Sequence, residues 1–362
     1  MKKTFLALSM ISAIGFMSTI AGSAAAQSTV TIYGIADTGI AIEKGGSAGS
    51  VSKLTSGIGS GSRLGFKGTE DLGGGLSAFF LLESGINIDA GSSGQGGLMF
   101  GRQAYVGVKG DFGTLTAGRQ YTPEYLTLAF ADPFGTGFAG DAANIMPNSG
   151  TGASRMDNTL KYVTPSFDGF TGELAYGFGE TAGDTSTGRQ IGAAIGYTSG
   201  PFAVRLGYHK RNNDTTTLKN TEDGKTTLLA ATYDFGVAKA HLAYGINKGL
   251  NSSPLRNTAN PYGSLIAPTA STDSTDFLLG VTMPFGSNKI LASYIRKDDK
   301  TTKNQDASQL AVAYIYSLSK RTDLYAAYAR IDNKNGAGYT VGSAIEAGSG
   351  DSALHLGIRH SF

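Results

Sequence analysis

The stretch 238–248, AKAHLAYGINK, alternates between two kinds of side chain. Its even-numbered positions are apolar as far as Ile246, whereas its odd-numbered positions are charged, polar or small. Because successive side chains of a β-strand point to opposite faces, a period of two predicts a strand with one apolar and one polar face. The same stripe recurs in 202–209, 277–283 and 310–318.

Segments of this kind follow one another along most of the chain, and many have the ten or so residues that a tilted strand needs to cross a bilayer. Their number is even, as closed bacterial barrels require. The expected strands are the sixteen segments 29–43, 63–71, 76–88, 100–111, 113–122, 159–164, 169–179, 190–199, 202–212, 225–234, 238–248, 274–284, 288–297, 306–318, 322–332 and 352–362.

The connections between these segments alternate in length. Seven are short turns, such as 199–201, and eight are longer loops, such as 44–62 and 249–273. Short periplasmic turns and long external loops are typical of outer-membrane barrels. The face opposite the apolar stripe is small or charged, which suits a wet lumen, and closure removes strand edges that lipid would not tolerate. The sequence therefore predicts an all-β, 16-stranded antiparallel transmembrane β-barrel.

The N-terminus has the three parts of a secretory signal. Lys2 and Lys3 precede the apolar run 5–20, and small residues at 24–26 predict cleavage before Gln27. An N-terminal transmembrane helix is the alternative, but the run is short and ends in a cleavage site. We therefore expect a signal peptide at 1–26 and the barrel at 27–362.

Composition excludes several classes of function. Without the signal, the chain has 28 basic and 28 acidic side chains, so it lacks the basic excess of a nucleic-acid binder. It contains no cysteine, which excludes thiolate metal sites and cysteine nucleophiles. The four histidines are scattered without metal-ligand spacing, and no cofactor is expected.

Five stretches carry a family resemblance. The chain resembles the general porins of Gram-negative bacteria, of the betaproteobacterial type, and the matches occur in family order. They are VTIYGIAD (30–37), SRLGFKGTEDLG (62–73), FGRQAYVG (100–107), GTLTAGRQ (113–120) and the closing LGIRHSF (356–362).

The resemblance implies a homotrimer in the outer membrane, with the third external loop of each barrel folded inward. It implies contacts with outer-membrane lipid and lipopolysaccharide, and recognition of the strand ending in Phe362 by the barrel-assembly machinery. Such a channel passes small hydrophilic solutes and ions by passive diffusion.

The longest connection, 123–158, is expected to be that inward-folded loop. Its apolar part, FADPFGTGF (130–138), can pack on the wall while Asp132 and Asp141 face the water path. The opposite wall should carry basic groups, and resemblance and position select Arg63, Arg102 and Arg155.

Parity adds three observations about the wall. Glu83, Arg63 and Lys161 each oppose an apolar stripe and should face the lumen. Arg102 shares the parity of outward Val106, so either a bulge intervenes or it lies at the strand end. Arg119 shares the parity of Leu115 and is a weaker candidate. Because the basic wall groups expected at the constriction slightly outnumber the acidic ones, we expect a weak preference for anions.

Three other functions compete with a general diffusion channel. A sugar- or solute-specific channel would need a line of lumenal aromatic residues. A barrel enzyme would need a catalytic group at one rim, for which His209 is the one lead, and a structural or adhesive barrel would need a plug domain. Matches to a dinucleotide motif (135–140) and a nucleophile elbow (45–49) lack the required strand and helix context.

Overall fold

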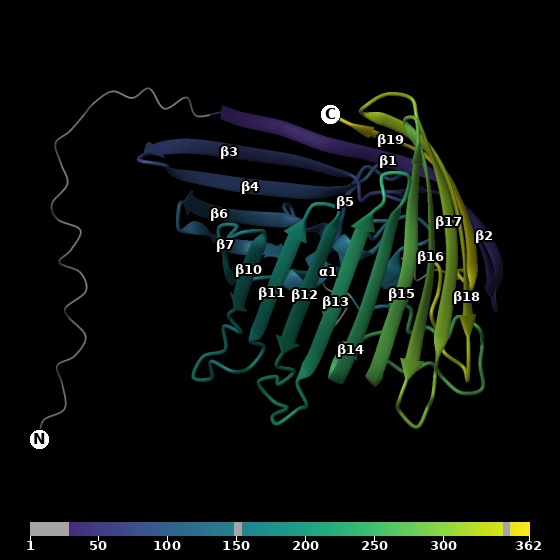
Figure 1. Cartoon of the computed structure of the whole chain (residues 1–362). Helices are drawn as coiled ribbons and strands as arrows, with labels where there is room; N and C mark the ends of the chain where they lie inside the picture. Colours follow the sequence, from purple (N-terminus) through teal and green to yellow (C-terminus); the bar gives the residue numbers. More distant parts are fainter. Residues whose placement is uncertain (1–28, 148–153, 343–347) are drawn as a thin grey trace, which may run out of the picture.

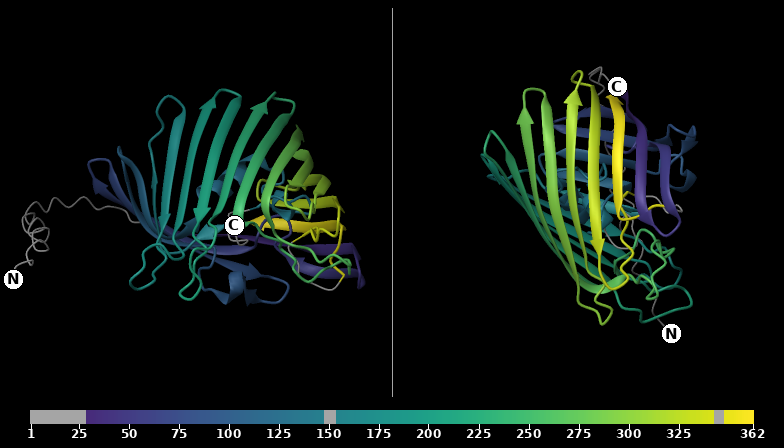
Figure 2. Two further views of the ribbon diagram at one scale, coloured as in Figure 1. Left: turned by 90° about the horizontal axis from the view of Figure 1, so that it is seen from below. Right: turned by 90° about the vertical axis from the view of Figure 1, so that its right-hand side faces the viewer.

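The computed structural model describes residues 29–147, 154–342 and 348–362, and these form a closed antiparallel β-barrel (Figures 1 and 2). The predicted signal peptide lies outside the described residues. The wall runs β1-β3-β4-β6-β7-β9 and then in chain order from β10 to β19, and β19 pairs with β1 to close it. This arrangement confirms the predicted sixteen-stranded barrel.

The strands are β1 (Thr29–Gly46), β2 (Gly49–Ser56), β3 (Arg63–Gly73), β4 (Leu76–Asn87), β5 (Ser92–Ser93), β6 (Gln103–Gly110), β7 (Gly113–Tyr121), β8 (Arg155–Met156), β9 (Thr159–Val163), β10 (Phe170–Gly177), β11 (Gln190–Ser199), β12 (Phe202–Arg211), β13 (Gly224–Asp234), β14 (Lys239–Ser253), β15 (Ser271–Phe285), β16 (Asn288–Asp299), β17 (Ala307–Ser317), β18 (Thr322–Asn333) and β19 (Ser352–Ser361). The helical segments are α1 (Pro123–Ala131), η1 (Gln95–Gly97) and η2 (Ala142–Asn144).

The period of two in the sequence becomes two faces of the wall. On β14, outward Leu242 and Tyr244 are 45% and 47% exposed, whereas inward His241 and Ala243 are 5% and 3% exposed. Apolar side chains therefore cover the outside of the barrel. Among the described residues, no helix has both the length and the hydropathy of a transmembrane helix.

The short turns use glycine where the backbone requires it. Between β3 and β4, Gly73, Gly74 and Gly75 have φ of 83°, 61° and 80°, a region that residues with a Cβ rarely adopt. The sequence GGG is thus the reason that a tight turn forms here.

The region 44–62, expected to be a loop, contains a strand. β2 pairs with the C-terminal half of β1, from Thr38 opposite Ser56 to Gly46 opposite Gly49. β3 pairs with the N-terminal half of β1. The alternation of Val51, Lys53 and Thr55 with Leu54 was the signal for it.

Tyr and Phe cluster near the ends of the expected strands, among them Tyr33, Tyr105, Tyr233, Phe235 and Phe285, and this clustering predicts an aromatic girdle at the membrane interfaces. The girdle is only partly present. Tyr233, Phe235 and Phe285 are 42%, 63% and 46% exposed on the outside. Tyr33 and Tyr105, however, point into the lumen, because the Tyr33 hydroxyl donates to Glu83 and the Tyr105 ring packs edge-on against Phe79. Assigning these two to the girdle was wrong, since their parity opposes that of Ile32 and Val106.

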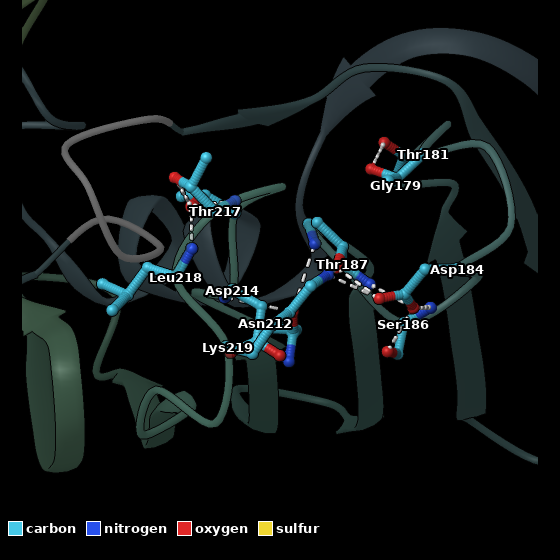
Figure 3. Close-up of polar contacts among 12 residues, drawn as sticks. Gly179, Thr181, Asp184, Ser186, Thr187, Asn212, Asp214, Thr217, Leu218 and Lys219 are labelled. Carbon is cyan, nitrogen blue, oxygen red and sulfur yellow. Dashed lines mark hydrogen bonds and ion pairs between the residues drawn. The ribbon is translucent and has the colours of Figure 1, made fainter.

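Two long loops, 178–189 and 212–223, are tied together (Figure 3). The Asp184 carboxylate accepts hydrogen bonds from the Ser186 and Thr187 hydroxyls at 2.6 and 2.7 Å, and Lys219 pairs with it at 2.6 Å. Asn212 accepts from the Gly188 backbone N–H. These contacts order part of the long-loop rim beside the opening.

Candidate functional site

The segment after β7 begins with a helix whose start is encoded locally. Thr122 caps α1 by accepting from the Tyr125 backbone N–H at 3.0 Å, Pro123 occupies the first turn, and Glu124 lies near the positive end of the helix. α1 then packs on the inner faces of β11, β12 and β13. The third loop is therefore folded inward, as predicted.

Small lumenal residues make room for this loop. A Cβ on Gly207 would lie 2.5 Å from the Thr127 hydroxyl, one on Gly192 would lie 2.7 Å from Pro123, and one on Gly280 would lie 2.7 Å from Pro133. Arg205 donates to the Thr127 hydroxyl at 2.8 Å. Glycines on the lumenal face of β11, β12 and β15 thus leave the space in which the loop packs.

Asp132 shapes the loop from within. Its carboxylate accepts the backbone N–H groups of Phe134, Thr136 and Ala142 at 2.9 to 3.0 Å, and the residue is 3% exposed. The expectation that Asp132 faces the water path is therefore wrong. An acidic residue between apolar ones can satisfy backbone donors as readily as it can meet water.

Asp141 does lie on the lumen. It caps η2 by accepting from Ala143 N–H and forms an ion pair with Arg256 at 3.0 Å. Farther along, Asn144 donates to Gln309 of β17 at 2.9 Å, and the Phe138 ring packs edge-on against Tyr325 of β18. The loop thus spans the lumen from β7 to the opposite wall.

Three predicted arginines lie close together: Arg63 begins β3, Arg102 precedes β6, and Arg155 begins β8 within the 123–158 connection itself. Arg102 pairs with Glu83 at 2.8 Å, and Arg63 lies 3.8 Å from the same carboxylate. Arg102 and Arg155 both donate to the Tyr121 hydroxyl, at 2.8 and 2.7 Å. We call Arg63, Arg102 and Arg155 the arginine cluster.

The ambiguous parity of Arg102 has a simple resolution. β6 begins at Gln103, so Arg102 precedes the strand and its side chain turns inward to Glu83. The strand-end alternative holds, and no bulge is needed.

A cavity of ≈ 610 Å³ lies between the arginine cluster and the loop. It is lined by five basic residues of the described chain, Arg63, Arg102, Arg155, Lys53 and Arg256, and by two acidic residues, Glu43 and Asp141. Lys53 pairs with Glu43 at 2.9 Å. Sequence reasoning missed Lys53, Glu43 and Arg256. The alternation along β2 would have placed Lys53 on the lumenal face.

Lys161 and Arg119 lie elsewhere. Lys161 faces the lumen but pairs with Glu173 at 3.4 Å, which also pairs with Arg205 at 2.8 Å. Arg119 pairs with exposed Asp157 and donates to the Gly101 carbonyl, so it does not join the arginine cluster.

His209, the one lead to a catalytic group, is 2% exposed on β12, and neither ring nitrogen has a hydrogen-bond partner among the described residues. The described residues also contain no group of three or more His, Asp or Glu side chains suited to a metal ion.

The chain is similar to known outer-membrane proteins over its whole length. The family model of Gram-negative porins matches residues 7–336. Outer membrane porin protein 32 of Delftia acidovorans is 34% identical and a porin of Bordetella pertussis is 33% identical, each with 100% of both chains covered. The anion-selective porin from Comamonas acidovorans is 32% identical, with a TM-score of 0.76 over 93% of this chain and 100% of that one.

A trimeric form of OmpT from Vibrio cholerae, 18% identical with a TM-score of 0.64, shares the fold over 92% of this chain. The closed wall, the inward loop and the similarity to full-length relatives all point to one family. This chain belongs to the Gram-negative porins, which are channels of the outer membrane.

Proposed function

We propose that the cavity between the arginine cluster and the inward loop is the constriction of a general diffusion channel, and that it prefers anions weakly. The supporting observation is its charge. Five basic residues line the cavity, and three carboxylates, Glu43, Glu83 and Asp141, pair with four of them, which leaves an excess of two positive charges.

Charge of this kind acts through local potential. A unit charge 4 Å from a passing ion contributes about 1 kcal/mol in water, which is about fivefold in relative permeability. The screening length falls from about 10 Å at 0.1 M salt to about 3 Å at 1 M. We therefore expect a modest preference for anions that weakens as salt is raised. The anion selectivity of the Comamonas relative agrees with this sign.

Reversal potentials of the purified protein in a planar bilayer test the proposal. A gradient of KCl around 0.1 M should give a potential of the sign set by chloride, and Glu83→Gln should strengthen it. A cation preference that Arg63→Gln leaves unchanged would refute the proposal.

We further propose that the protein is a homotrimer that associates through the outer face of β1, β3, β4, β6 and β7. Its exposed side chains there are aliphatic, with Val30, Ile32 and Val106 59% to 63% exposed, whereas outward tyrosines line β14 to β18. A wall that faces protein needs no interfacial tyrosine. Mass measurement in detergent should give three chains, and Val106→Arg should give single ones.

Two proposals concern export. Removal of 1–26 should leave Gln27 as the first residue of the mature protein, which N-terminal sequencing can check.

The C-terminal strand should direct assembly by the barrel-assembly machinery, so deletion of Phe362 should reduce the amount of barrel in the outer membrane.

A further inference from the structure

Three aromatic side chains face the lumen on one part of the wall, where β1, β3, β4 and β6 lie side by side (Figure 1). They are Tyr33 of β1, Phe79 of β4 and Tyr105 of β6, and each is half-buried. The Phe79 and Tyr105 rings meet edge-on, with their centroids 6.3 Å apart. We call Tyr33, Phe79 and Tyr105 the aromatic patch.

Glycines let two of these rings lie close against the wall. A Cβ on Gly65 would collide with the Tyr33 ring, and one on Gly107 would lie 2.8 Å from the Phe79 ring. The helix of the inward loop packs on β10 to β14 instead, so it does not cover this part of the wall. The aromatic patch therefore keeps part of its surface open to the lumen.

Other lumenal aromatic side chains in the described part of the chain are covered. Phe134, Phe138, Tyr325 and Tyr339 are only 3% to 5% exposed, and they belong to the apolar core that the loops form with the wall. Rings packed in this way stabilise the loops and cannot meet a solute. The aromatic patch differs from them because its rings are half-buried on an uncovered wall.

A basic group borders the aromatic patch. The Lys67 ammonium lies 5.2 Å from the centroid of the Tyr33 ring, and Lys67 is exposed. Among the described residues this ammonium pairs with no carboxylate. Lys67, Leu81 and Tyr105 lie in one row across β3, β4 and β6, so the Cα atoms of Lys67 and Tyr105 are about 10 Å apart. One small solute can therefore reach both side chains.

The aromatic patch is continuous with the arginine cluster. The Tyr33 hydroxyl donates to Glu83 at 2.8 Å, and the same carboxylate pairs with Arg102. Arg63 begins β3, and Lys67 lies nearer the short turn that joins β3 to β4. An anion that leaves the arginine cluster toward the short turns thus passes the aromatic patch next.

We propose that the aromatic patch and Lys67 form a binding site for small aromatic carboxylates, a substrate class that rests on the anion preference proposed above. The ring of the solute stacks on Tyr105 beside the edge of Phe79, and its carboxylate pairs with the Lys67 ammonium. Aromatic rings favour offset-stacked and edge-on neighbours, and an edge-on pair offers a third ring both kinds of contact.

The combination of rings and charge separates this class from two others. A neutral sugar can stack on an aromatic ring but has no charge for Lys67. An aliphatic carboxylate can pair with Lys67 but gains no aromatic contact. An aromatic carboxylate uses both parts of the site.

Block of the chloride current in a planar bilayer tests the site, with benzoate as the probe. Cyclohexanecarboxylate has the same charge and a similar size but no aromatic ring, and it is the matched control. Contact between aromatic rings adds about fivefold to binding beyond the buried area, so benzoate should reach half-block at about one fifth of the control concentration. Tyr105→Leu should abolish this difference and Tyr105→Phe should keep it, whereas Lys67→Gln should weaken block by both anions.

Three results would overturn the inference. They are equal block by the two anions, a benzoate preference that Tyr105→Leu retains, and block that Lys67→Gln leaves unchanged. Because the two anions have equal charge, their comparison is independent of the preference for chloride over potassium. A reversal potential of the cation sign would refute the proposed function, whereas equal block in a chloride-preferring channel would refute this site alone. Conductance in KCl verifies that each variant forms an open barrel.

Discussion

Two charged groups on the inner wall contrast in exposure and in balance. The arginine cluster has three guanidinium groups around one carboxylate and lines a cavity. Lys297 of β16 and Asp276 of β15 form an ion pair with an N···O distance of 2.6 Å, and both side chains are 0% exposed. Ser253 and Asn247 complete its hydrogen bonds. Unbalanced charge beside water can therefore act on passing ions, whereas a balanced and buried ion pair stabilises the wall.

The largest expected effect comes from breaking the sealed pair. Lys297→Met leaves the Asp276 carboxylate buried without its cation, which costs about 3–5 kcal/mol of unfolding free energy. Denaturant unfolding in detergent measures it. Lys297→Met/Asp276→Leu removes both charges and should recover most of the loss. Equal stability of the single variant and wild type would contradict the contrast.

The next effect comes from the arginine cluster, and it should change ion selectivity rather than stability. Arg63→Gln/Arg155→Gln removes the excess of two positive charges and should bring the chloride-to-potassium permeability ratio close to one, with little change in stability. Reversal potentials measure the ratio, and unfolding midpoints serve as the control. If stability falls as in Lys297→Met while the ratio is unchanged, the two groups do not differ as described.

A smaller effect follows from loosening the loop that faces the cluster. Asp132→Ala removes the acceptor of three backbone N–H groups, and these groups can bind water instead only if the loop moves off the wall, so the effect is local to the loop. The loop should leave its seat, which raises single-channel conductance and current noise. Quiet, wild-type conductance from Asp132→Ala would show that the loop is held by other contacts.

The smallest effect separates charge from its placement. Tyr121→Phe keeps all charges but removes the hydroxyl to which Arg102 and Arg155 donate. Because full removal of a charge is worth about fivefold, the permeability ratio should shift by less than about twofold. A shift as large as that of Arg63→Gln would mean that placement, rather than charge number, sets the preference.

Much of this molecule could be predicted from sequence because a membrane barrel repeats one rule. Period-two stripes located the strands, and turn lengths ordered them, although β2 was missed in a glycine- and serine-rich segment. Parity placed Arg63 and Glu83 correctly, since both lie within regular strands. Family resemblance supplied Arg102 and the inward loop.

What could not be predicted depends on contacts between distant segments. The role of Asp132 is set by backbone donors up to ten residues away, and no local pattern separates that from solvent exposure. Arg256 reaches Asp141 from a loop more than a hundred residues later. Tyr33 and Tyr105 are a different case. Their parity, opposite to that of Ile32 and Val106, already indicates the lumen, but both were assigned to the outward girdle because they lie near strand ends.

The proposed excess of positive charge at the constriction should concentrate anions there. Anomalous diffraction from crystals soaked in rubidium bromide tests it directly, since bromide and rubidium can be distinguished at their absorption edges. We expect bromide peaks in the cavity beside Arg63 and Arg155 and no rubidium peaks at those positions. Rubidium in that cavity, with bromide absent, would contradict it.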